Sequence, residues 1–146
     1  MVLYLDSSSI VKLYLTEEAS ALTREPLSQA AKSVTSLVAY AEVRAALAAA
    51  RRARRIRSNR ELAAAKSDVE LDWEEFAHAE VTESLVGTAG DLAEKHSLSG
   101  FDALHLASAL GFRASTAEEV QLLTWDHRLA RAAQNEGFVL AHEVTT

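Results

Sequence analysis

The hydrophobic pattern of the chain begins with an unbroken apolar run at residues 2–5. A run without alternating polar positions is typical of a strand buried on both faces of a parallel sheet. Asp6 follows directly, and the serines at positions 7–9 offer N-caps for a helix over residues 10–15. Because ligands bind at the carboxyl ends of strands in open α/β sheets, Asp6 stands where a site would lie. The alternative role for this carboxylate is to cap the next helix.

Strands and helices alternate along the rest of the chain. The pattern predicts further strands at residues 33–35, 79–81, 120–124 and 138–141. It predicts longer helices at residues 16–29, 37–56, 58–78, 82–95, 101–110 and 127–135. Pro26 is expected to kink or divide the first of these.

This alternation predicts the fold class. Strands that alternate with helices indicate β-α-β crossovers and hence an α/β fold, in which helices cover a parallel sheet on both sides. No repeat, low-complexity linker or break in composition divides the sequence. We therefore expect residues 1–146 to form a single domain.

Composition narrows the setting in which the protein works. Hydrophobic residues make up 49% and charged residues 25% of the chain, which is ordinary for a globular protein. There is no cysteine, so disulfides and thiolate metal sites are excluded and a reducing compartment is favoured. The N-terminus lacks a basic region followed by an apolar one, and no apolar run approaches about 18 residues. These observations predict a cytoplasmic protein that does not enter membranes.

The charge of the chain is unevenly distributed. The formal net charge is −6, which alone argues against a general nucleic-acid binder. However, six of the fifteen basic residues fall within residues 51–60, a segment without any acid. These six are Arg51, Arg52, Arg54, Arg55, Arg57 and Arg60. The protein is therefore expected to carry one basic patch on an otherwise acidic surface.

Four acids follow strand ends or stand near helix starts in apolar surroundings: Asp6, Glu42, Asp102 and Asp126. Glu42 lies three or four residues from the apolar positions of its predicted helix, Val38, Ala39, Ala45 and Ala46. Because parallel strands deliver their carboxyl ends to one edge of the sheet, we expect the four acids to converge. The structural alternative is that the three aspartates cap helices and that Glu42 pairs with an arginine.

Convergence of four acids would favour a metal. Their like charges would repel and raise one another's pKa, and a divalent cation would remove that cost. Oxygen ligands, without cysteine or a histidine pair at ligand spacing, indicate Mg²⁺ or Mn²⁺ in preference to zinc. Such an ion suits phosphoryl chemistry, because it polarises a phosphodiester and lowers the pKa of a bound water.

The sequence resembles the PIN-domain ribonucleases, most closely the VapC-type toxins of toxin–antitoxin pairs. The matching segments span nearly the whole chain in the family's order: Leu5-Asp6-Ser7-Ser8 with Val11-Lys12, Ala41-Glu42-Val43, Asp102-Ala103-Leu104-His105-Leu106-Ala107 and Leu123-Thr124-Trp125-Asp126. The third segment is the most specific of these.

The resemblance implies a three-layer α/β/α sandwich around a parallel sheet of about five strands. It also implies an endoribonuclease that depends on Mg²⁺ or Mn²⁺, in which a metal-activated water attacks RNA. Asp6, Glu42, Asp102 and Asp126 match the family's acidic quartet, and Thr124 matches the hydroxyl residue beside the fourth acid. The implied partners are an RNA substrate, a cognate antitoxin that blocks the groove, and a second copy of the chain in a homodimer.

The arginine run has two interpretations. It is either the solvated end of a helix or a surface that holds RNA or a protein partner, and we favour contact because an acidic nuclease needs somewhere to hold a phosphate backbone. Arg51 and Arg55 share one helical face and are the candidate RNA contacts.

Several other side chains have both a structural and a functional interpretation. His105 either packs within its helix or faces the site, and His127 is either an exposed residue or a phosphate contact. Ser7 and Ser8 are expected to cap, although Ser7 would also suit a hydrogen bond to a metal-bound water. Trp73 and Trp125 either pack in the core or an interface, or stack on bases.

Two other functional classes fit part of the pattern. An aspartyl-phosphate phosphotransferase also places an aspartate after its first strand, but it carries a second acid two residues later, where this chain has Ser8. A non-catalytic module that binds RNA or a protein through the arginine run is the other alternative. It is disfavoured because a binding module gains nothing from four mutually repelling acids.

Overall fold

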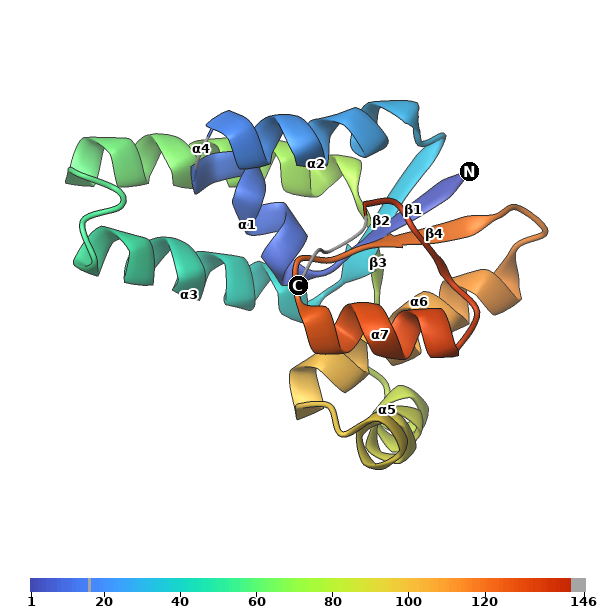
Figure 1. Cartoon of the computed structure of the whole chain (residues 1–146). Helices are drawn as coiled ribbons and strands as arrows, with labels where there is room; N and C mark the ends of the chain where they lie inside the picture. The colour runs from blue at the N-terminus through green and yellow to red at the C-terminus, as the bar shows by residue number, and fades with distance from the viewer. Residues whose placement is uncertain (16, 143–146) are drawn as a thin grey trace.

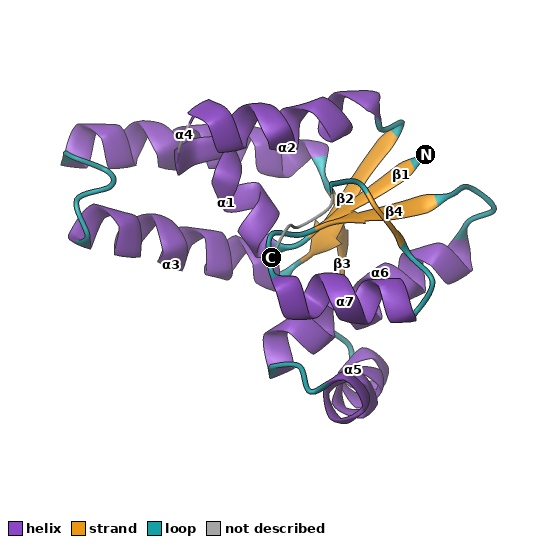
Figure 2. Ribbon diagram, viewed as in Figure 1, coloured by secondary structure: helices purple, strands orange, loops and turns teal. Residues whose placement is uncertain are grey.

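A computed structural model describes residues 1–15 and 17–142. The predicted α/β fold is confirmed, with five parallel strands ordered β3-β2-β1-β4-β5 in one sheet. The strands are β1 (Val2–Leu5), β2 (Lys32–Ser36), β3 (Ala77–Ala79), β4 (Val120–Leu123) and β5 (Val139–Leu140). Figure 2 shows the strands side by side between two groups of helices.

The helices form two layers, one on each face of the sheet (Figure 1). One layer contains α1 (Ser7–Leu15), α2 (Glu17–Gln29), α3 (Val38–Arg52) and α4 (Asn59–Glu75). The other contains α5 (Glu83–His96), α6 (Gly100–Ser115) and α7 (His127–Asn135). Within residues 1–15 and 17–142, no helix is both long and apolar enough to cross a membrane.

Strand β1 connects the two halves of the hydrophobic core. Its alternate side chains point to opposite faces, as strand geometry requires. Tyr4 is buried in the core beneath α5, α6 and α7, whereas Leu3 and Leu5 are buried in the core beneath α1, α3 and α4. All three side chains are fully inaccessible. The unbroken apolar run is therefore explained by a central strand with helices on both sides.

Several predicted boundaries shift in the structure. The third strand occupies residues 77–79 instead of 79–81, because α4 ends at Glu75 and the buried Phe76 leads straight into the sheet. Helix α3 ends at Arg52, four residues early, and Arg54 then adopts a left-handed backbone with φ 62°. Thr16, the expected start of the second helix, lies outside the described residues, and Pro26 is accommodated inside α2.

The expected apolar face of α3 needs one correction. Its buried residues are Ala39, Val43, Leu47 and Ala50. Ala45, which was expected on that face, is exposed. Glu42 lies beside this stripe and is partly buried, with 24% of its side chain exposed. The acid therefore reaches the edge of the core from α3.

Candidate active site

Asp6 is the most enclosed acid of the predicted quartet. It is 2% exposed, at the end of the central strand. The Ser8 hydroxyl donates to both of its carboxylate oxygens at 2.8 and 2.9 Å, and Thr124 Oγ1 donates to Oδ2 at 2.7 Å. The Ser9 amide donates to Oδ1 at 3.0 Å, so Asp6 caps α1 as well. These hydrogen bonds offset the cost of burying a carboxylate and fix its orientation.

The serines after Asp6 have different roles from those expected. They were expected to cap a helix beginning near residue 10, but α1 begins at Ser7 and Asp6 provides the cap. Ser8 instead links two loops, because its hydroxyl also accepts a hydrogen bond from the Trp125 amide at 3.0 Å. Ser9 donates to the Leu123 carbonyl at 2.6 Å. The first helical turn is thereby joined to the end of β4.

Asp126 is positioned by the same hydroxyl that holds Asp6. Thr124 Oγ1 accepts the Asp126 amide at 3.0 Å while it donates to Asp6. The carboxylate of Asp126 caps α7 by accepting the Leu129 amide at 2.8 Å. Thr124 is 1% exposed, so this link between the two acids is buried.

Asp102 lies in the first turn of α6, which Ser99 caps. Burial raises the pKa of Asp102, and the negative charge of Asp126 raises it further. The hydrogen bond with Ser99 lowers this pKa, the charge of Asp6 raises it by a smaller amount, and His105 has the smallest, lowering effect. Electrostatics therefore links the three aspartates. Among the described residues, however, no three acidic or histidine side chains are already spaced as ligands of one ion.

Glu42 is held by a buried histidine. His105 Nε2 lies 2.7 Å from Glu42 Oε1, and His105 Nδ1 lies 2.7 Å from the Tyr4 hydroxyl. If Tyr4 donates to Nδ1 and Nε2–H donates to the carboxylate, both bonds are satisfied by a neutral imidazole. Burial raises the pKa of Tyr4, and the charges of Asp6 and Glu42 add to this effect, which keeps its proton available for donation.

The sequence left the role of His105 open, did not single out Tyr4, and gave Ser9 only a capping role. His105 is fully buried and also bonded to Glu42, so it combines the two roles considered for it. A signal for Tyr4 was present, because a buried tyrosine in an aliphatic strand needs a hydrogen-bond partner for its hydroxyl.

An open groove of about 490 Å³ has Asp126 in its lining. Ser8, Lys12, Arg55, Trp125 and Asp126 contribute polar or aromatic side chains to it, and residues of α1 and α3 form its apolar part. Lys12 Nζ lies 5.7 Å from the centre of the Trp125 ring. The groove thus combines cations, an aromatic ring and an acid.

The remaining candidates lie elsewhere. Arg51 Nε donates to Asn59 at 3.1 Å, which ties it to α4. Trp73 packs within the protein, with its ring stacked 4.1 Å from that of His78. His127 is exposed.

Comparisons with known proteins agree on one family. The family model for the PIN domain matches residues 3–135. Two Mycobacterium tuberculosis proteins, Ribonuclease VapC45 of strain CDC 1551 / Oshkosh and Ribonuclease VapC49 of strain ATCC 25618 / H37Rv, are each 40% identical over 141 residues. Each alignment covers 93% of this chain and 92% of the relative.

Two solved structures have the same fold. A toxin–antitoxin complex from Klebsiella pneumoniae superposes with a TM-score of 0.67 at 16% identity, over 97% of this chain and 98% of that one. FitAcB from Neisseria gonorrhoeae gives a TM-score of 0.68 at 17% identity, over 92% of this chain and 94% of that one.

Proposed function

This chain belongs to the PIN-domain family, among the members related to VapC ribonucleases, and on that premise we propose that it is a metal-dependent endoribonuclease of the VapC toxin type. The observation that carries the proposal is the placement of Asp6 and Asp126 on one buried hydroxyl, Thr124 Oγ1, close enough to Asp102 that their charges raise its pKa. A carboxyl group whose proton affinity is raised by burial and by neighbouring carboxylates is costly for stability alone and useful where a cation must bind.

The donor set fits Mg²⁺ or Mn²⁺, although the ligands would still have to close around the ion. Asp6, Asp102 and Asp126 would hold it through oxygen atoms, with Glu42 as the fourth acid. When bound, the ion supplies polarisation of the phosphodiester and activation of a water. The protein's part is orientation, since the Thr124 hydroxyl fixes the Asp6 carboxylate and the backbone of Asp126 together.

We assign one of two roles to the second carboxylate oxygen of Glu42, Oε2. It either transfers a proton or binds the ion. His105 engages Oε1, and this contact orients the carboxylate from the buried side. Tyr4 in turn fixes the imidazole, so the acid on α3 is positioned from the central strand. His105 and Tyr4 act as positioning residues in this proposal, because they work through Glu42.

The groove beside Asp126 suits a single RNA strand. Lys12 and Arg55 offer cations for phosphates, and Trp125 offers a ring on which a base can stack. Of the two arginines predicted to contact RNA, the geometry favours Arg55, which lines this groove, over Arg51, which bonds to α4.

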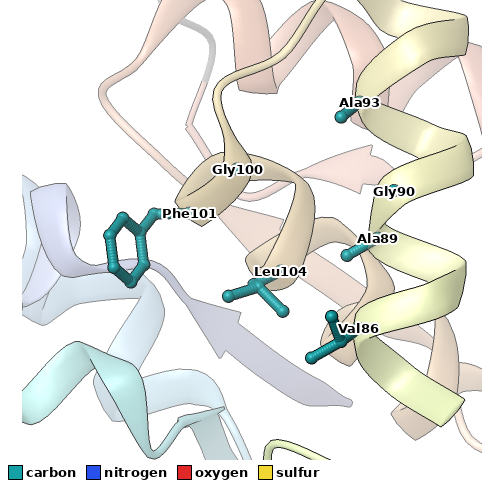
Figure 3. A pocket seen from close by; sticks show the side chains of 7 residues that line it. All are labelled: Val86, Ala89, Gly90, Ala93, Gly100, Phe101 and Leu104. Atoms are coloured by element: carbon teal, nitrogen blue, oxygen red, sulfur yellow. The ribbon is translucent and has the colours of Figure 1, made fainter. Parts of the chain in front are cut away.

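A cognate antitoxin and a homodimer complete the proposal. For the dimer we assign the apolar groove of about 310 Å³ between α5 and α6, where Val86 and Leu104 point into the gap and Phe101 stands at its rim (Figure 3). Phe101 is 56% exposed and precedes Asp102, so a second copy here would border the site. Phe101→Ser should produce monomers in analytical ultracentrifugation, and an unchanged mass would remove this assignment.

The phosphotransferase alternative is weakened by the surroundings of Asp6. The position two residues later, where such an enzyme carries a second acid, holds Ser8, whose hydroxyl donates to the Asp6 carboxylate at 2.8 and 2.9 Å.

The deciding experiment combines cleavage with metal binding. Asp102→Asn should reduce cleavage of single-stranded RNA by at least about 100-fold, since removing even a supporting group of a metal site costs 10–100-fold. Mg²⁺ should raise the melting temperature of the unmodified protein by mass action, and this rise should disappear in the variant. Asp91→Asn, at an exposed acid of α5, is the matched control.

Three results would contradict the proposal. They are full cleavage by Asp102→Asn, cleavage that persists in excess chelator, or the absence of cleavage by the unmodified protein in Mg²⁺ and in Mn²⁺. In the last case a binding module would be the better description. Adding a purified antitoxin should not restore cleavage in that case, because the antitoxin is proposed as an inhibitor.

A further inference from the structure

A second polar hollow lies between α7 and the end of α5. Its volume is about 500 Å³. The side chains that line it are mostly basic or amide: Lys95, His96, Ser97, Arg128, Arg131 and Asn135. The sequence pattern did not indicate a site at these residues, because they come from two helices that are separate in the sequence.

The hollow carries unbalanced positive charge. Two of its lining side chains already contact an acid, since Lys95 Nζ and His96 Nε2 lie 2.8 and 2.7 Å from Glu136 Oε1. Those contacts lower the pKa of Glu136, so one negative charge is committed to this pair. Arg128 and Arg131 are exposed and form no ion pair with any carboxylate among residues 1–15 and 17–142. Two guanidinium groups therefore face solvent together on a protein of net charge −6.

Helix α7 places these arginines in line with the acids. Asp126 caps the helix, Arg128 lies in its first turn, and Arg131 lies three residues further on the same exposed face. At about 1.5 Å per residue, Arg131 is about 8 Å along the axis from Asp126. The opposite wall of the hollow is also close in sequence to an acid of the site. Ser97 is two residues from Ser99, which caps the helix that carries Asp102.

We propose that this hollow is a second phosphate-binding site, which holds the backbone of the RNA strand beyond the phosphodiester that is cleaved. Arg128 and Arg131 are its main contacts, because guanidinium groups bind phosphate oxygens in pairs, and Lys95 adds a third cation at the rim. A strand bound in the groove of Arg55 and Trp125 would pass Asp126 and continue along α7 into the hollow. This inference rests on the proposed nuclease function and extends it to the length of RNA that is held.

The test measures RNA affinity as a function of strand length and salt. In the Asp102→Asn background, where the RNA should survive, labelled single strands of about 4 and about 16 nucleotides are compared, which spans common site sizes. Arg128→Ala/Arg131→Ala should weaken binding of the longer strand much more than that of the shorter one. The log–log salt slope for the longer strand should fall by roughly 1.4, at about 0.7 per lost contact.

A matched control separates local contact from total charge. Arg24→Ala/Lys32→Ala also removes two positive charges, from exposed positions on α2 and at the start of β2. It should leave the preference for longer RNA intact, and Arg128→Lys/Arg131→Lys should keep most of the salt slope. Circular dichroism checks that each variant is folded.

Two outcomes would overturn the inference. One is an unchanged affinity and slope for the longer strand in Arg128→Ala/Arg131→Ala, in which case the hollow does not hold RNA. The other is an equal loss in Arg24→Ala/Lys32→Ala, which would make the effect one of net charge. Both differ from failure of the nuclease proposal, which would show as an absence of cleavage by the unmodified protein in Mg²⁺ and Mn²⁺.

Discussion

Asp126 combines a structural and a chemical role in one side chain, and the two can be separated. Asparagine caps helices about as well as aspartate, so Asp126→Asn should change the free energy of unfolding by less than about 0.5 kcal/mol. Asp126→Ala loses the bond to Leu129 and should cost about 1 kcal/mol. Cleavage should fall strongly in both variants. Urea denaturation and an RNA cleavage assay measure the two effects, and normal activity in Asp126→Asn would show that the carboxylate is only a cap.

The raised pKa of Asp102 makes the stability of the metal-free protein depend on pH. Because the folded pKa lies above the ordinary value of 3.8, this group's contribution is present in full below 3.8 and is lost as pH rises through the folded pKa. Asp102→Asn should therefore melt at a higher temperature than the unmodified protein at neutral pH. The difference should shrink as the pH is lowered toward about 4. Melting curves in chelator check this, and a difference independent of pH would contradict it.

The sequence was informative about the acids and uninformative about what holds them. Asp6, Asp102 and Asp126 could be singled out because strand ends and helix starts are visible as breaks in a local pattern. The contacts of Tyr4 with His105 and of Thr124 with Asp6 span 101 and 118 residues. Such contacts depend on strand order and register, which a local pattern does not determine.

At the scale of elements, apolar runs located the strands well, and helix ends were harder to place. The buried strands β1 and β4 were predicted nearly residue for residue, because few other structures accommodate consecutive large apolar side chains. The end of α3 was placed too late because its stop involves a left-handed arginine instead of a glycine. Tertiary packing around the buried Ile56 holds that turn, and the sequence carries no local mark of it.

Two glycines should respond oppositely to alanine. Gly137, which ends α7, has φ +89°, so Gly137→Ala should destabilise the protein by about 1–2 kcal/mol. Gly87 lies in the exposed face of α5 with open space around it, so Gly87→Ala should stabilise by about 0.5–1 kcal/mol. Urea denaturation of both variants tests this, and a loss of stability in Gly87→Ala would contradict the expectation drawn from the open space at that position.

At the scale of the molecule, the basic residues are concentrated at one end of α3 and beside α7 on an acidic protein. In a cleavage-deficient background, Arg55→Ala should weaken RNA binding and lower the salt slope by roughly 0.7, because Arg55 lines the groove beside Asp126. Arg51→Ala is the matched comparison and should have less effect. Both should change stability by no more than about 1 kcal/mol. Equal effects would show that the groove does not direct the strand.

The central position of β1 also determines when, during synthesis, the site around Asp6 can form. Strand β1 needs β4 as a neighbour, and the Asp6 carboxylate needs the Thr124 hydroxyl, which is synthesised 118 residues later. At a synthesis rate of about 5–20 residues per second, that interval is roughly 6–24 seconds. Throughout that interval, Asp6 lacks the hydrogen bond from the Thr124 hydroxyl. The centre can therefore be completed only after Thr124 has been synthesised, 118 residues after Asp6.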